Sequence, residues 1–235
     1  MGFFKKILPN DLYRKFLLEK NNPFIKFFNE SYSQEGEDMI LRRIFENKKS
    51  GFYVDVGAYH PKRFSNTYYF YKRGWLGINI EARPGSKQLF DKIRPRDINI
   101  EVPISNFSEE LTYYAFDEPA LNGLIKDLAD LRVKNKASKI LFTKKMNTST
   151  LSEILDKYLP KNTVIDFMSI DVEGLDLNVL ESNNWDKYQP RYILIEDLDQ
   201  CNTSLSDSTI SKFLIQKNYS LFAKTVNTNF YISSS

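Results

Sequence analysis

The 235-residue sequence predicts an α/β fold in which helices cover both faces of a seven-stranded, mostly parallel sheet. Short apolar segments, rich in β-branched and aromatic residues, alternate with amphipathic segments along most of the chain. These short segments are apolar without a break, which is typical of strands covered on both faces. The composition, with 42% hydrophobic residues, is that of a folded globular protein.

The strands are expected in two groups. Five apolar segments are expected to form the parallel core: 52–56, 76–80, 98–104, 164–170 and 192–195. Two runs near the C-terminus, 220–224 and 229–232, predict a closing antiparallel hairpin. A longer insert, residues 106–147, separates the third and fourth core strands and begins with an expected antiparallel strand at 111–116.

Helix boundaries follow from capping signals. The helix expected at 34–47 ends before Gly51, which is a stop signal. Thr150 and Glu153 predict a capping box at the start of a helix over 151–159. A last helix is expected near 209–217.

The chain is expected to comprise an N-terminal helical cap, residues 1–32, and a Rossmann-like domain, residues 33–235. Apolar and basic residues alternate in the cap, so the alternative is a helix that binds a partner or a membrane surface. No segment reaches the about 20 apolar residues of a membrane span, and lysines interrupt the start of the chain before a signal peptide could form. A cytoplasmic protein is expected, with peripheral contact at the inner face of the membrane left open.

The net charge and the cysteine content exclude several kinds of function. A net charge of +3 among 63 charged side chains is too weak a bias to predict a nucleic-acid partner. The single cysteine, Cys201, excludes an intrachain disulfide and a cysteine-based zinc cluster, which suits a reducing compartment. The oligomeric state is not predicted.

Two strand ends predict a nucleoside-containing cofactor. The first strand runs into Asp55-Val56-Gly57, and the second ends at Glu81. An acid therefore follows the glycine turn at the sequence spacing that is typical of an acid binding the ribose hydroxyls. The later glycines of a dinucleotide motif are missing, because Tyr59 and Pro61 stand in the turn. A nucleoside without a diphosphate fits S-adenosylmethionine.

Four sequence blocks together resemble the FkbM family of methyltransferases over about residues 31–198. The blocks are Ser31-Tyr-Ser-Gln-Glu-Gly-Glu-Asp38, Tyr53-Val-Asp-Val-Gly-Ala58, Arg63-Phe-Ser-Asn-Thr67 and Ser169-Ile-Asp-Val-Glu-Gly174. The resemblance implies a class I methyltransferase fold and O-methylation. The segments Gly74-Trp-x-Gly-Ile-Asn79 and Asp97-Ile-Asn-Ile100 resemble members found among bacterial capsule and surface-polysaccharide genes, which implies a sugar hydroxyl as acceptor.

The resemblance also implies roles for individual residues. Those expected around the cofactor are Gln34, Asp55, Gly57, Ala58, Tyr59, Glu81, Ser105, Asn106 and Asp171. Within this set Glu81 would hold the ribose, Ser105 and Asn106 the adenine side, and Gln34 the methionine end. Asp171 would face the transferred methyl group. Ordinary loop capping is the alternative role for Gln34, Ser105 and Asn106.

An alcohol must lose its proton as it is methylated, and the sequence leaves two routes open. Acids at the ends of the fourth and fifth core strands could bind Mg²⁺ or Mn²⁺, with Asp171, Glu173, Glu196 and Asp197 as the tentative ligands. Helix capping by Glu173 and solvation of Asp197 and Asp199 are the alternatives. Without a metal, the catalytic candidates are Asp171, Glu173 and His60, which is the only histidine.

The cationic segment 126–145 suggests a substrate. It is hypothesised to form a lid whose Lys144 and Lys145 meet the diphosphate of a nucleotide-linked sugar, with a solvated helix face as the alternative. Two other functions stay open: a metal-dependent glycosyltransferase, suggested by Asp197-Leu198-Asp199, and a non-catalytic nucleoside-binding scaffold.

Overall fold

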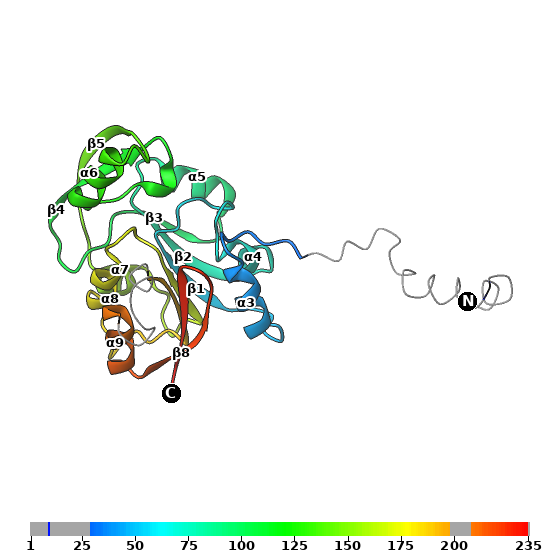
Figure 1. Ribbon diagram of the computed structural model, residues 1–235. Coiled ribbons are helices and arrows are strands. Elements are labelled where there is room, and N and C mark those ends of the chain that lie inside the picture. Colours follow the sequence, from blue (N-terminus) through cyan, green and yellow to red (C-terminus); the bar gives the residue numbers. More distant parts are fainter. Residues whose placement is uncertain (1–8, 10–28, 198–207, 235) are drawn as a thin grey trace. The chain divides into compact units, whose positions relative to one another are not determined.

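The structure, a computed structural model, describes Pro9, residues 29–197 and residues 208–234 (Figure 1). Residues 31–235 form one unit by themselves. The helical cap expected at 1–32 falls almost wholly outside the described residues, and so do Asp199 and Cys201. No helix in the described part of the chain is long and apolar enough to cross a membrane.

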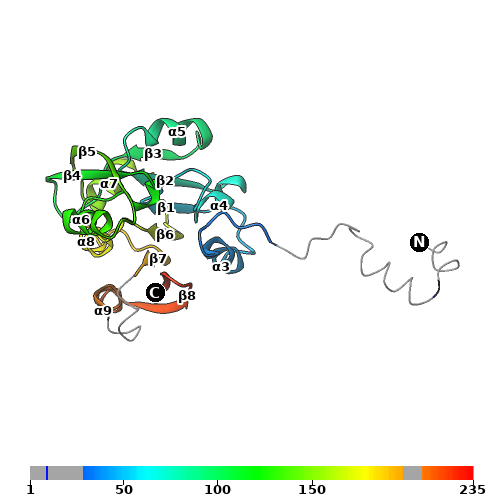
Figure 2. The ribbon, with the colours of Figure 1, turned by 45° about the horizontal axis from the view of Figure 1, so that its top comes forward.

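Among the described residues, the main sheet has seven strands in the order β3-β2-β1-β6-β7-β9-β8 (Figure 2). They are β1 (Phe52–Val56), β2 (Leu76–Glu81), β3 (Ile98–Glu101), β6 (Phe167–Ile170), β7 (Tyr192–Glu196), β8 (Tyr219–Lys224) and β9 (Thr228–Ser233). The first five strands in this order are parallel, and β9 is antiparallel to both β7 and β8. The predicted sheet and its closing hairpin are confirmed.

The strand order places a topological switch point between β1 and β6. From β1 the chain moves outward to β2 and β3, then returns past β1 to form β6 and moves the other way to β7. In open α/β sheets, ligands bind at the carboxyl ends of the strands on either side of such a point.

Helices pack on both faces of the sheet because its strand residues alternate in direction. Tyr53 and Phe167 lie in one core cluster with α3 (Glu37–Ile44) and α4 (Tyr68–Lys72). Val54 and Met168, their chain neighbours, lie in the other. The helices of that second cluster are α7 (Leu151–Tyr158), α8 (Asp176–Glu181) and α9 (Thr209–Gln216). The remaining helix of the domain outside the insert is α5 (Ser86–Ile93).

Element boundaries differ from the sequence expectations where backbone chemistry intervenes. Helix α3 begins at Glu37 rather than at residue 34, because Gly36 adopts a left-handed conformation with φ 89°. Strand β3 ends at Glu101, ahead of Pro103, which has no N–H to donate to a ladder. The capping box of Thr150 and Glu153 at the start of α7 is confirmed.

The insert forms a small unit beside the main sheet, in green in Figure 1. Its strands β4 (Glu110–Phe116) and β5 (Ile140–Asn147) pair only with each other and are antiparallel. Between them lie a 3₁₀ turn, η1 (Pro119–Leu121), and helix α6 (Lys126–Lys134). The strand expected at 111–116 is therefore confirmed.

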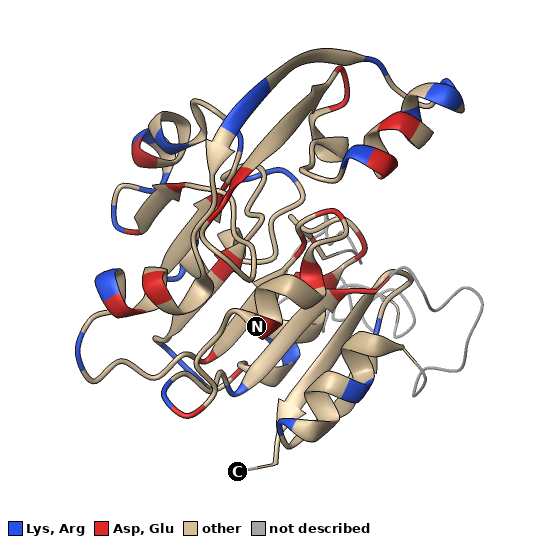
Figure 3. Ribbon diagram, turned by 90° about the vertical axis from the view of Figure 1, so that its left-hand side faces the viewer, with Lys and Arg blue, Asp and Glu red and all other residues tan. Residues whose placement is uncertain are grey.

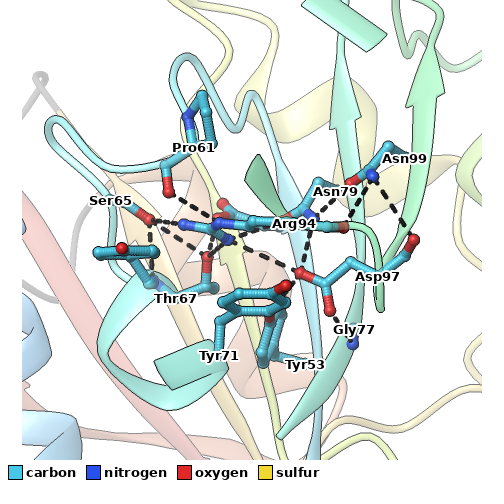
Figure 4. A network of polar contacts seen from close by, with 12 residues as sticks. Tyr53, Pro61, Ser65, Thr67, Tyr71, Gly77, Asn79, Arg94, Asp97 and Asn99 are labelled. Carbon is cyan, nitrogen blue, oxygen red and sulfur yellow. Dashed lines mark hydrogen bonds and ion pairs between the residues drawn. The ribbon is translucent and has the colours of Figure 1, made fainter. Parts of the chain in front are cut away.

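A buried arginine ties the loop after β1 to the sheet (Figure 4). The Arg94 side chain is fully buried, and its guanidinium donates to the carbonyl oxygen of Pro61 and to the hydroxyls of Ser65 and Thr67 at 2.6–2.7 Å. It also donates to Asn79 Oδ1 on β2 at 3.1 Å. All of these acceptors are oxygens, as a buried guanidinium requires.

Asp97 balances the charge of Arg94 at the other end of this network. Its carboxylate lies 3.9 Å from the guanidinium and accepts hydrogen bonds from the Tyr53 hydroxyl (2.6 Å), Asn79 Nδ2 (3.0 Å) and the Gly77 N–H (3.1 Å). A buried ion pair contributes to stability only if its remaining polar groups are satisfied, as they are here.

Arg94→Ala is expected to lower the free energy of unfolding by about 3–5 kcal/mol, because Asp97 and the polar loop atoms lose a buried partner. Urea unfolding followed by circular dichroism measures the change. Lys87→Ala in the same helix region is the matched control: its pair with Asp91 is solvent-exposed and should contribute less than about 1 kcal/mol. Equal effects of the two variants would contradict the structural role given to Arg94.

Candidate active site

A cavity of about 330 Å³ opens at the carboxyl ends of β1, β2, β6 and β7, which is where the strand order places a ligand. The strand ends supply Val56 to Tyr59, Ile80 to Ala82, Ser169, Asp171 to Glu173, and Glu196. The insert supplies Tyr113, Pro119 to Leu124, and Arg132. Residues of both the main sheet and the insert therefore line the cavity.

Gly57 lets the ends of β1 and β6 approach each other at the switch point. It has φ 78°, and a Cβ built on it would lie 1.7 Å from the carbonyl oxygen of Asp171. The N–H groups of Gly57 and Ala58 both donate to Ile80 O, at 2.9 and 3.0 Å. The cavity floor is therefore bare backbone, which a ligand can approach closely.

Glu81 is fixed at the end of β2 by main-chain hydrogen bonds. One carboxylate oxygen accepts the N–H of Tyr59 at 2.6 Å, and the other accepts the N–H of Arg83 at 2.8 Å. Burial raises the pKa of Glu81, against the opposing effect of these hydrogen bonds. Each oxygen keeps a further lone pair, so the carboxylate can accept from two adjacent hydroxyls.

Asp55 lies beneath the floor and connects the cavity to the Arg94 network. Its carboxylate accepts a 2.6 Å hydrogen bond from Thr67 Oγ1, the same hydroxyl that accepts from Arg94. Burial raises the pKa of Asp55 to about 6, although the Thr67 hydrogen bond and the Arg94 charge favour the carboxylate. Asp55 thus supports the turn at Gly57 from below.

Two carboxylates at adjacent strand ends face the cavity. Ile170 of β6 pairs with Ile195 of β7, so Asp171 and Glu196 follow at neighbouring positions. Burial, and then the charge of Glu196, raise the pKa of Asp171 well above its usual value. Burial and neighbouring acids raise the pKa of Glu196 to about 8. Burial and the closeness of the two carboxyl groups therefore both favour the protonated forms of this pair.

Glu173 holds the insert against the β6 loop. Its carboxylate forms an ion pair with Arg132 of α6, whose other guanidinium nitrogen donates to Leu121 O. Helix α8 has no side-chain cap at its N-cap residue, Leu175, and Asp176 accepts the N–H groups of Val172 and Gly174 in the preceding turn, each at 3.1 Å. The helix-capping alternative for Glu173 is therefore wrong.

Of the four acids predicted as metal ligands, three line the cavity and Asp197 does not. Asp197 is buried away from the cavity and accepts hydrogen bonds from Ser208 Oγ (2.7 Å) and Asn229 Nδ2 (3.3 Å). Successive side chains at a strand end point to opposite faces, so Glu196 and Asp197 diverge. In the described part of the chain, no group of three His, Cys, Asp or Glu residues is arranged to hold a metal ion. The metal prediction is not supported.

His60 is also absent from the cavity wall. Its Nδ1 accepts the N–H groups of Lys62 and Arg63 at 3.1 and 3.0 Å, so the imidazole holds the turn that follows β1. Burial and nearby arginines lower its pKa. The structure therefore gives His60 a position in a turn and no contact with the place where a substrate would react.

The two residues expected to contact the adenine, Ser105 and Asn106, do not line the cavity either. Ser105 donates to Asn106 Oδ1 at 3.3 Å, and Asn106 donates to Glu181 at 3.4 Å. The wall there is instead the apolar run Val102 to Ile104. The remaining expected cofactor residues all line the cavity: Gln34, Asp55, Gly57, Ala58, Tyr59, Glu81 and Asp171.

Sequence reasoning missed several lining residues. Asn66 belongs to the sequence block 63–67, and its side chain donates a hydrogen bond to Ser169 Oγ at 2.9 Å. Tyr113 and Arg132 come from the insert. Their participation had no local signal, because it depends on how the insert docks.

Of the described cations of the insert, Arg132 alone lines the cavity. Figure 3 marks the lysines and arginines of the described residues in blue. Lys145 is exposed on β5 and pairs with Glu110 at 2.5 Å, and Lys144 does not line the cavity. The charged lining residues are Asp55, Glu81, Asp171, Glu173, Glu196 and Arg132. The cavity is therefore strongly acidic, which does not suit a diphosphate within it.

Residues 55–219 match the methyltransferase FkbM domain. Solved structures similar to the chain include a putative O-methyltransferase from Klebsiella pneumoniae (11% identity, 99% of this chain and 95% of that chain, TM-score 0.42). An O-methyltransferase from Bacillus cereus in complex with SAH is 9% identical (98% and 94%, TM-score 0.40). A human methyltransferase 10 domain containing protein is 9% identical (93% and 92%, TM-score 0.43). No curated protein matches the sequence.

The raised pKa of Glu196 predicts a pH-dependent loss of stability. The folded protein, with this pKa at about 8, binds more protons than the unfolded chain, where a glutamate has a pKa of about 4.3. The free energy of unfolding should therefore fall as pH rises through this window. Glu196→Gln should reduce that fall, so the variant gains stability relative to the parent protein between pH 5 and pH 9.

Urea unfolding at several pH values measures this difference. Glu109→Gln, which replaces an exposed glutamate outside the cavity, is the control and should follow the parent protein. A constant stability difference between Glu196→Gln and the parent protein across the pH range would contradict the prediction.

Proposed function

The chain belongs to the FkbM family of methyltransferases, which use S-adenosylmethionine as methyl donor, and we propose that it methylates a hydroxyl group of a sugar. The single observation that carries this proposal is the acidic cavity at the switch point, where Asp171 and Glu196 face the space beside the Gly57 turn. These carboxylates can accept a proton and hydrogen bonds, both of which an alcohol acceptor needs.

The residues around the cavity fit S-adenosylmethionine. Gly57 lines the cavity with backbone alone, and Glu81 presents a carboxylate suited to the two ribose hydroxyls. Gln34 would contact the methionine end, and the apolar run Val102 to Ile104 would cover the adenine. When bound, the cofactor supplies an electrophilic methyl group and a positive charge, which the acidic wall would stabilise.

Asp171 is the proposed proton acceptor. With the methyl donor bound, the donor would supply the methyl group, and the Asp171 carboxylate would take the proton that the acceptor hydroxyl loses. Burial and Glu196 raise the pKa of Asp171, which brings this carboxylate closer to the basicity that proton transfer requires. Glu173 is proposed to act through the position of Arg132 and the insert, since the two side chains are paired.

The charge of the cavity defines the acceptor class more narrowly. Five carboxyl groups line it against one cation, Arg132, which Glu173 already pairs. A phosphate group within this space would be repelled, whereas the hydroxyls of an uncharged sugar ring can donate to the carboxylates. If the sugar is nucleotide-linked or part of a capsule polysaccharide, its phosphates should remain outside the cavity, next to the insert. Asp197, the one described member of the Asp197-Leu198-Asp199 motif, does not line the cavity, so the described residues do not favour a metal-dependent glycosyltransferase.

Formation of S-adenosylhomocysteine from S-adenosylmethionine with a panel of acceptors tests the proposal. Uncharged glycosides and nucleotide-linked sugars should serve as acceptors, amines should not, and EDTA should leave the rate unchanged. Asp171→Asn should lower kcat about 10²- to 10⁴-fold, the usual contribution of a general base. Its Kd for S-adenosylhomocysteine, measured by calorimetry, should stay within a few-fold of the parent value.

Glu109→Gln is again the matched control, with parental kcat expected. Methyl transfer to nitrogen, or turnover that needs a divalent cation, would overturn the proposed chemistry. An unchanged kcat in Asp171→Asn would remove the role of Asp171 as base.

A further inference from the structure

Tyr113 reaches the cavity from the insert. It lies on β4, where alternate residues face opposite sides, and its ring is 1% exposed. Lys144 of β5 is its pairing partner, and Tyr113 is the β4 residue that lines the cavity. The insert therefore places a tyrosine against a site otherwise built from the main sheet.

The hydroxyl of Tyr113 is buried without a hydrogen-bond partner. Among the described residues, only three buried side-chain polar atoms have none, and the other two, on Asn183 and Asn229, are not at the cavity. The Asn122 amide is close enough to lower the pKa of Tyr113, but the two groups do not have the geometry of a hydrogen bond. The oxygen of that amide accepts the N–H of Phe116 at 2.7 Å. Buried polar groups are rarely left unpaired, so each such group calls for an explanation.

The surroundings of Tyr113 place its hydroxyl at the β2 side of the cavity. The charges that act on it most strongly are those of Glu81 and Arg83. Burial raises its pKa, so the hydroxyl stays protonated and can both donate and accept a hydrogen bond. This is the side where Glu81 and the apolar run Val102 to Ile104 lie, opposite the acids at β6 and β7.

We propose that Tyr113 is a cofactor-binding residue whose hydroxyl hydrogen-bonds the nucleoside of S-adenosylmethionine. Both the adenine edge and the ribose offer a donor and an acceptor, and either would satisfy the buried hydroxyl. The insert then has two tasks: Arg132 docks it on the β6 loop, and Tyr113 completes the nucleoside site. This inference rests on cofactor binding in the cavity and is independent of which acceptor is methylated.

Tyr113→Phe tests the proposal, because it removes the hydroxyl and keeps the ring. Calorimetric titration of the full chain with S-adenosylhomocysteine should show a Kd about 3- to 10-fold higher, the loss expected for one neutral hydrogen bond. 5′-Methylthioadenosine, which lacks the amino-acid portion, should weaken by the same factor. Urea unfolding of the ligand-free variant should show stability equal to or above that of the parent protein, since an unpaired buried group is removed.

Tyr114→Phe is the matched control, as it removes a hydroxyl from the neighbouring β4 position that does not line the cavity, and it should change neither Kd. Unchanged affinity for both ligands in Tyr113→Phe would overturn the proposal. Weaker binding of S-adenosylhomocysteine alone would assign the contact to the amino-acid portion and overturn the nucleoside assignment. Lower stability of the ligand-free variant would show a structural hydrogen bond instead.

Discussion

The close approach of the ends of β1 and β6 is the constraint on which the site depends. With Gly57 at φ 78° and the Asp171 carbonyl where a Cβ would stand, the two strand ends meet backbone to backbone. The N–H of Asp171 donates to Val56 O at 3.0 Å, which extends the pairing of β1 with β6 up to the turn. A side chain here would collide with the Asp171 backbone and push the two strand ends apart.

A second requirement is that the loop after β1 stays in place above this floor. Arg94 supplies the donors for its carbonyl and hydroxyl groups, and Asp97 supplies the balancing charge. Thr67 connects Arg94 to Asp55, because its hydroxyl accepts a hydrogen bond from Arg94 and donates one to the Asp55 carboxylate. The buried polar network and the cavity are therefore connected through Thr67 and Asp55. The ionisable groups of the network, Arg94 and Asp97, are hydrogen-bonded to protein atoms, whereas Glu81, Asp171 and Glu196 line the cavity and can contact a ligand.

The insert closes the cavity from the other side through charged contacts. Arg132 pairs with Glu173, and Arg63 of the loop after β1 lies 3.8 Å from Glu118. Glu173 has a positive φ of 56°, and its carboxylate pairs with Arg132 of α6. Asp171 and Glu196 face the cavity, where burial and then the neighbouring acids raise their pKa values. An acidic wall of this kind suits a positively charged cofactor.

The sequence by itself determined the sheet, because strand apolarity and capping signals are local, and it determined Gly57 and Glu81, because they stand at fixed offsets from strands. Tertiary structure alone decided which side chains meet. Asp197 and His60 were plausible by residue type, but strand alternation turns the first away and turn hydrogen bonds engage the second. Tyr113 and Arg132 carry no motif, and only the docking of the insert brings them to the site. Contacts between segments distant in the chain leave no local pattern, whereas strand and turn propensities do.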